Sequence, residues 1–124
     1  MTQVTEPKTA EFRLNSDRDQ TLHQVAQLER EFAAIVASAA DGSAGGDDEH
    51  DPEGATVAFE RQHVAALLDR ARAHLAAIDS ALRKLGSGAY DTCDGCGGPI
   101  GAERLAARPA ALTCIRCAAK RARP

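Results

Sequence analysis

Four cysteines stand in the last third of the sequence as two pairs with the same internal spacing. Cys93 and Cys96 form one pair, Cys114 and Cys117 form the other, and 17 residues separate the two pairs. Two C-x-x-C turns at this separation can direct four thiolates at one ion, the arrangement of a structural zinc site. We therefore predict one structural zinc ion bound by these cysteines. Because four thiolates leave no open position for water, this zinc is not expected to be catalytic.

Other uses of paired cysteines are less consistent with the sequence. A thiol exchanger needs only one C-x-x-C pair, and this chain has two at ligand spacing. No apolar run reaches the ~18 residues of a membrane span, and Met1–Asn15 lacks the apolar region of a signal peptide. We therefore expect a cytoplasmic protein without membrane contact. The cytoplasm is reducing, which favours metal binding over disulfides.

Two apolar stripes with the period of an α-helix precede the cysteines, and they predict helices over 17–40 and 52–86. Asp51 is a suitable N-cap, Pro52 suits the first helical position, and Gly86 is a suitable terminator. The first stripe consists of Leu22, Val25, Leu28, Phe32, Ile35 and Ala39. The second, a heptad seam, consists of Val64, Leu68, Ala71, Leu75, Ile78, Leu82 and Leu85.

The predicted fold is mostly α: an antiparallel two-helix coiled-coil hairpin over 16–86, followed by a small four-cysteine zinc finger over 87–118. We expect a flexible N-terminal tail over 1–15, an acidic tip loop over 41–53 and a basic C-terminal tail over 119–124. We expect a monomer, although the heptad seam also permits pairing between chains.

The predicted helix starts imply a register between the two helices. With the hairpin base near Asp17 and Lys84, Leu75 and Ile78 are expected to face residues of the first stripe. These are Val25, Leu28 and Phe32.

The net charge of −3 conceals an asymmetry along the chain. The segment 41–53 carries six acidic residues and no Lys or Arg, whereas the chain from Gly98 onward carries six basic residues and one acid, Glu103. Such asymmetry indicates a charged partner. A solvated loop and a solvated tail are the simpler interpretations of the two segments.

The sequence around the cysteines resembles a known family. The residues that carry the resemblance are Gly88-Ala89-Tyr90, Cys93-Asp94-Gly95-Cys96-Gly97, Ile100, Arg104-Leu105, Ala107, Pro109 and Cys114-Ile115-Arg116-Cys117. They are similar to the DksA/TraR family of four-cysteine zinc-finger proteins, from about Asp51 to Cys117. The resemblance implies a regulator of transcription initiation that binds bacterial RNA polymerase through its secondary channel, without sequence-specific DNA binding.

The resemblance also implies functional residues at the hairpin tip. Members of the family carry an Asp-x-x-Asp-x-Ala motif there, whose alanine matches Ala55. The two aspartate positions fall on His50 and Glu53, and Asp48 and Asp51 lie close by. We expect Asp48, Asp51, Glu53 and Ala55 to act near the polymerase active site.

Docking is expected to use basic residues nearer the finger, namely Arg70, Arg104 and Arg108. Some relatives bind the alarmone ppGpp with basic residues, and two of those positions are Ala77 and Ala118 here. A dependence on ppGpp is therefore not expected.

Two other classes of function stay open at this point. One is a zinc-ribbon module that binds nucleic acid directly through its basic end, and the other is a helical adaptor or dimer that does not contact polymerase. Because aromatic stacking platforms are typical of single-strand binding, Tyr90 alone gives the first little support. No Ser/His/Asp set, phosphate loop or open metal site is visible, so an enzyme is not expected.

Overall fold

The computed structural model describes residues 7–42 and 52–122 of the chain. Among these residues the backbone contains no strand, only an isolated antiparallel bridge between Thr92 and Pro99. None of the described helices is long and apolar enough to cross a membrane. The helices are α1 (Pro7–Gly42), α2 (Pro52–Ser87), α3 (Ala102–Ala107) and α4 (Ile115–Ala122).

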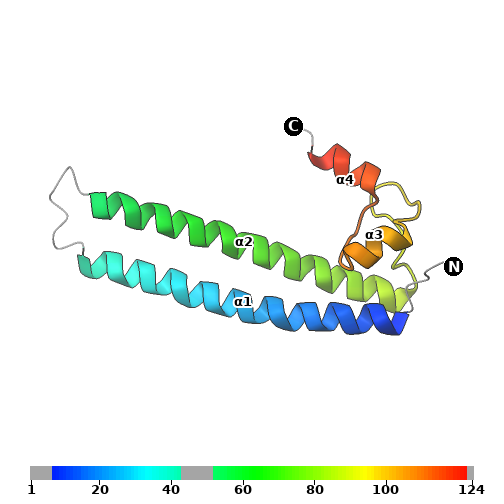
Figure 1. The fold of residues 1–124 in the computed structure, drawn as a ribbon, viewed down its shortest axis with the longest axis horizontal. Helices are drawn as coiled ribbons and strands as arrows, with labels where there is room; N and C mark the ends of the chain where they lie inside the picture. Colours follow the sequence, from blue (N-terminus) through cyan, green and yellow to red (C-terminus); the bar gives the residue numbers. More distant parts are fainter. Residues whose placement is uncertain (1–6, 43–51, 123–124) are drawn as a thin grey trace. The chain divides into compact units, whose positions relative to one another are not determined.

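Helices α1 and α2 lie side by side and run in opposite directions (Figure 1). The chain divides into two compact units, and both long helices contribute to each. The finger unit comprises Met1–Gln20 and His74–Pro124, and the coil unit comprises Thr21–Ala73. The predicted fold class, a mostly α antiparallel hairpin with a four-cysteine finger, is confirmed.

The core of the coil unit is a narrow stripe between two helical segments. Its buried residues are Leu28 of α1 and Val64, Leu68 and Ala71 of α2. Partly buried apolar side chains flank them, at Val25, Phe32, Ile35 and Leu67. Two helices can bury only the side chains that face each other, so this core has a single layer.

The core of the finger unit draws on more segments. Its buried residues come from α1 (Ala10, Leu14), from α2 (Ile78, Ala81) and from the chain beyond α2 (Tyr90, Cys93, Ile100, Leu105). The ion pair between Arg18 and Asp79, with Nε and Oδ1 2.7 Å apart, also joins the two long helices in this unit. The finger therefore packs on a short helical pair.

Helix α1 begins ten residues before its predicted start. The predicted flexible tail over 1–15 is wrong for residues 7–15, which form the first turns of the helix. Proline is favoured at the first helical position, so Pro7 is a start signal of the same kind as Pro52. The burial of Ala10 and Leu14 in the finger-unit core stabilises these added turns.

The predicted register was also wrong. Ile78 is buried with Ala10 and Leu14 in the finger unit, whereas Leu28 belongs to the coil-unit core. On α1 the buried position near this point is Thr21, while the predicted seam residue Leu22 is exposed. The buried face of α1 includes Thr21 at this point, and a search for apolar residues alone does not detect a buried threonine.

The remaining boundaries differ by smaller amounts. Helix α1 extends through Gly42 and α2 begins at Pro52, so both ends of the predicted loop over 41–53 are helical. At the other end of the chain, α4 includes residues 119–122, which were predicted as tail. Alanine, lysine and arginine are strong helix formers and extend this helix past the last cysteine.

Candidate metal centre

The first cysteine pair lies on a tight backbone turn that follows α2. The Cys93 N–H donates to the Gly98 carbonyl at 2.7 Å, and the Gly97 N–H donates to the Cys93 carbonyl at 2.9 Å. Gly97 has a φ of 75°, a conformation that L side chains rarely adopt. The glycines after the first pair thus allow the chain to reverse directly behind the two sulfur atoms.

The second cysteine pair lies at the start of α4. Cys114 immediately precedes the helix, and its carbonyl accepts the Ala118 N–H at 2.9 Å. Cys117 follows within the first turn, so both thiols occur at the same end of one helix. The Asp94 N–H donates to the Leu112 carbonyl at 2.8 Å and joins the two turns.

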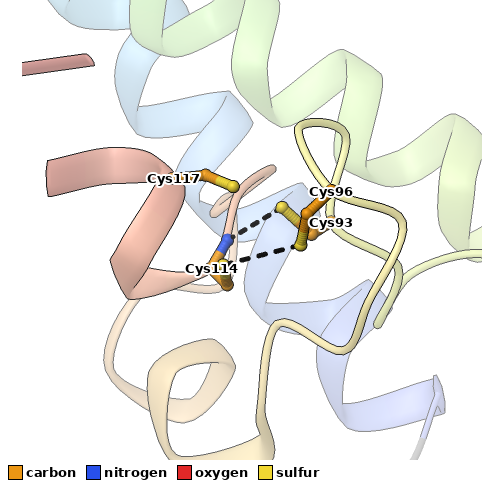
Figure 2. Close-up of side chains that lie close together, drawn as sticks. All are labelled: Cys93, Cys96, Cys114 and Cys117. Carbon is orange, nitrogen blue, oxygen red and sulfur yellow. Dashed lines mark hydrogen bonds between the residues drawn. The ribbon is translucent and has the colours of Figure 1, made fainter. Parts of the chain in front are cut away.

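The four sulfur atoms gather at one point, within 4.8 Å of one another. Figure 2 shows the side chains converging from the first turn and from α4. The Cys96 and Cys114 sulfurs are 3.9 Å apart. Zinc–sulfur bonds of about 2.3 Å in a tetrahedron require sulfur–sulfur distances of roughly 3.8 Å, so the cluster fits the ion.

Gly95 is needed at this cluster for space rather than for backbone conformation. A Cβ atom at this position would lie 2.8 Å from the Cys117 sulfur and 3.1 Å from the Cys117 Cβ. The backbone of the first turn therefore lies so close to Cys117 that the position between the first two cysteines has room only for glycine. No larger residue fits without displacing a ligand.

The electrostatics of the cluster favour a cation. Hydrogen bonds from backbone N–H groups, chiefly that of Cys114, lower the pKa of Cys93 to about 6. The opposite holds for Cys117, where hydrogen bonding to the sulfurs of Cys93 and Cys114 raises the pKa to about 12. The cluster thus stabilises some thiolates but not four at once. A divalent cation resolves this conflict because it stabilises all four charges.

The predicted tip residues lie at or beyond the limit of the described chain. Asp48 and Asp51 lie outside the described residues. Glu53 belongs to the first turn of α2, and Ala55 is exposed on the same helix. Of the predicted tip residues, the structure therefore describes Glu53 and Ala55, both within α2.

Two of the predicted docking residues line one hollow in the finger unit. Arg104 and Arg108 border a cavity of about 470 Å³ together with Asp17 and His74, whose Oδ2 and Nε2 atoms are 2.8 Å apart. Arg108 is exposed, whereas Arg104 is partly buried. Arg70 is exposed on α2 in the coil unit.

Two supporting contacts were not predicted from the sequence. Arg13 of α1 donates from Nη2 to the Ala106 carbonyl at 2.7 Å and thereby holds the end of α3. The Tyr90 hydroxyl donates to the Pro109 carbonyl at 2.7 Å, and burial raises the pKa of this phenol. Both contacts link distant segments, so no local pattern signals them.

Comparison with known proteins agrees with this geometry. Residues 88–123 match the family model of the prokaryotic dksA/traR C4-type zinc finger. The RNA polymerase-binding transcription factor DksA of Haemophilus influenzae is 45% identical over 49 residues, which span 40% of this chain and 34% of that protein.

A solved structure is also similar. The transcription factor DksA2 from Pseudomonas aeruginosa shows 30% identity, over 90% of this chain and 84% of that one, with a TM-score of 0.47. The finger match and the clustered cysteines together assign one structural zinc ion to this site. With this match, residues 88–123 form a C4-type zinc finger of the prokaryotic dksA/traR kind.

Proposed function

We propose that this chain is a transcription regulator that binds bacterial RNA polymerase and modulates initiation from the secondary channel. The observation that carries the proposal is the match of residues 88–123 to the dksA/traR finger, and a relative described as an RNA polymerase-binding transcription factor is 45% identical over 49 residues. A closed four-thiolate zinc site supports binding rather than catalysis, so we propose a regulator with no catalytic activity of its own.

The length of the hairpin helices supports entry into a channel. Helices α1 and α2 contain 36 residues each. At a rise of 1.5 Å per residue, each helix is about 54 Å long. A helix of this length can reach deep into a pore.

The acidic tip is the part proposed to act on the polymerase. Asp48, Asp51 and Glu53, followed by Ala55, would be delivered near the active site. Carboxylates there can disturb mobile polymerase elements that handle nucleotides and magnesium ions, since Mg²⁺ prefers oxygen ligands. The proposed effect is on promoter-complex stability rather than on a chemical step.

Docking is proposed to use basic side chains of the hairpin and finger. Arg70 and Arg108 are exposed and can pair with acidic groups of a partner, and Arg104 lines the same hollow as Arg108. Because Ala77 and Ala118 offer no charge, docking is proposed to be independent of ppGpp. Most residues of the two apolar stripes pack within the chain, which supports a monomer.

Co-purification followed by cross-linking tests this proposal. A photo-reactive amino acid in place of Glu53 should cross-link to polymerase segments around the active site. The same amino acid in place of Ala119, which is exposed on α4, serves as the matched control and should not reach those segments. Absence of any complex with purified polymerase, or identical cross-links from both positions, would contradict the proposal.

A further inference from the structure

The two cysteine turns share a feature beyond their cysteines: a threonine immediately precedes each pair. The sequences are Thr92-Cys93-Asp94-Gly95-Cys96 and Thr113-Cys114-Ile115-Arg116-Cys117. In both turns the threonine carbonyl accepts a hydrogen bond from a cationic side chain. Lys84 Nζ donates to the Thr92 carbonyl, and Arg104 Nε donates to the Thr113 carbonyl at 2.7 Å.

A peptide unit is planar, so fixing its carbonyl also fixes the N–H on its other side. The carbonyl of Thr113 and the N–H of Cys114 belong to one such unit, and this N–H donates to the Cys93 sulfur at 3.2 Å. Arg104 therefore holds the far side of the peptide group that hydrogen-bonds a ligand sulfur. A cation on the carbonyl also polarises the N–H and strengthens its bond to a thiolate.

In the first turn a cationic side chain likewise fixes the peptide group before the first cysteine, but the N–H of that group donates to a carbonyl rather than to a sulfur. The carbonyl of Thr92 and the N–H of Cys93 form one peptide unit, and this N–H donates to the Gly98 carbonyl at 2.7 Å. Lys84 Nζ also lies 3.0 Å from Asp94 Oδ1, so it grips the turn on both sides of Cys93. Its side chain is only 14% exposed, which strengthens a charged contact compared with one at the surface.

Lys84 also belongs to the last turn of α2. Its own carbonyl accepts the Ala89 N–H at 2.8 Å and the Ser87 hydroxyl at 3.1 Å. One residue thus joins the end of α2 to the first cysteine turn. Arg104 makes the corresponding connection from α3 to the second turn.

We propose that Lys84 and Arg104 are a matched pair of positioning residues for the zinc centre, each orienting the peptide group before the first cysteine of one turn. Neither residue touches the ion. They act by holding the ligand turns in the geometry that binds it. The inference goes beyond the proposed function and holds whether or not the chain binds polymerase.

The first test is the rate at which zinc leaves the intact, zinc-loaded chain when a chelator is in excess. Lys84→Met and Arg104→Met should each release zinc about tenfold faster, which corresponds to ~1.4 kcal/mol. Two control variants remove a positive charge without removing such a contact. They are Arg83→Met, beside Lys84 on α2, and Arg116→Met, between the cysteines of the second turn.

Both controls should release zinc at the rate of the unmodified chain. Release within twofold of that rate in both Lys84→Met and Arg104→Met would overturn the proposal. So would equal acceleration in the matched control, because a loss of positive charge would then explain the effect. If Arg104→Met does not fold, Arg104→Lys, which keeps the charge but loses Nε, should still accelerate release.

A second readout separates positioning from general loosening of the finger. The Cys93 sulfur also accepts the Gly95 N–H, at 3.3 Å, whereas Arg104 Nε donates to the carbonyl of Thr113, which belongs to a different peptide unit. In proton NMR, Arg104→Met should move the Cys114 amide resonance upfield, because its hydrogen bond weakens, and leave the Gly95 resonance in place. An equal movement of both resonances, or of neither, would overturn the proposal.

Discussion

The finger unit and the coil unit use the same two helices but bury side chains to different depths. In the finger unit, Leu14 and Ile78 are completely buried, at 0% exposure. In the coil unit the central residues Leu28 and Leu68 each retain 7%. The difference arises because the finger residues Tyr90, Ile100 and Leu105 pack into the same core as the helices, whereas every described residue of the coil-unit core belongs to α1 or α2.

This comparison indicates that the two units are stabilised by different means. The finger unit contains the zinc centre, and Cys93 belongs at once to its core and to the ligand set. Removing the ion therefore disturbs the core directly. The coil unit depends on a single apolar stripe and on helix propensity, and none of its described residues belongs to the metal cluster. We expect the two units to respond separately to metal and to mutation.

The largest effect is expected from loss of the metal. Cys114→Ser should abolish zinc binding and unfold residues 88–118, because structural zinc sites contribute on the order of 10 kcal/mol of binding energy to folding. NMR resonances of Val64 and Leu68 in the coil unit should persist. Ala119→Ser, an exposed change on α4, is the matched control. A metal-free chain with an unchanged, dispersed spectrum over 88–118 would refute this dependence.

A smaller effect is expected from truncating the two cores. Leu14→Ala should lower the free energy of unfolding by ~2–5 kcal/mol, since it leaves a cavity in a fully covered site. Leu28→Ala, in the single-layer stripe, should cost less than Leu14→Ala. Urea denaturation of both variants, with zinc present, measures the difference. Equal losses would mean that the two cores are equally well packed, and a larger loss for Leu28→Ala would mean that the coil-unit core is packed more tightly.

A more local effect is expected at the glycine between the first cysteines. Gly95→Ala should weaken zinc affinity about tenfold, as changes beside metal ligands commonly do, because its Cβ would collide with Cys117. Gly98→Ala is the control, since its Cβ would lie at an ordinary 3.5 Å from the Cys96 sulfur. Competition with a chromophoric chelator gives both affinities. Equal zinc affinities of the two variants would show that the close approach of Gly95 to Cys117 does not matter for zinc binding.

The smallest effect is expected at the surface of the coil unit. Arg72 Nη2 lies 3.3 Å from Glu29 Oε2, and both side chains are 53% exposed. A double-mutant cycle with Arg72→Ala and Glu29→Ala should give a coupling of ~0.2–1 kcal/mol that declines with added salt. A coupling energy well above ~1 kcal/mol would show that this ion pair, rather than the apolar stripe, stabilises the coil unit.

The parts that could be predicted from the sequence are those with local signals. The cysteine spacing identified the cluster, and Asp51-Pro52 marked the start of α2. The start of α1 was missed although Pro7 gave a similar signal, because only Ala10 and Leu14 continue the apolar stripe before the predicted start.

The rest depends on contacts between distant segments. The residues of α1 that contact Ile78 depend on the axial register between the two helices, and the apolar stripe of one helix does not determine that register. The Lys84 and Arg104 contacts to threonine carbonyls belong to the same class, because a backbone acceptor leaves no mark in the sequence. The repeated Thr-Cys-x-x-Cys pattern was visible, but its meaning required the structure.

The most direct test of the proposed function measures docking and action on one preparation. The triple variant Asp48→Asn, Asp51→Asn and Glu53→Gln removes three of the six carboxylates of segment 41–53, at positions distant in sequence from the cysteines. Competition binding gives its affinity for RNA polymerase, and a promoter-decay assay gives the open-complex lifetime. We predict that the triple variant binds polymerase with an affinity within a few-fold of that of the unmodified chain. We also predict that the bound variant no longer changes the open-complex lifetime. Full regulatory activity in the triple variant would contradict the account and make the acidic segment a solvated loop.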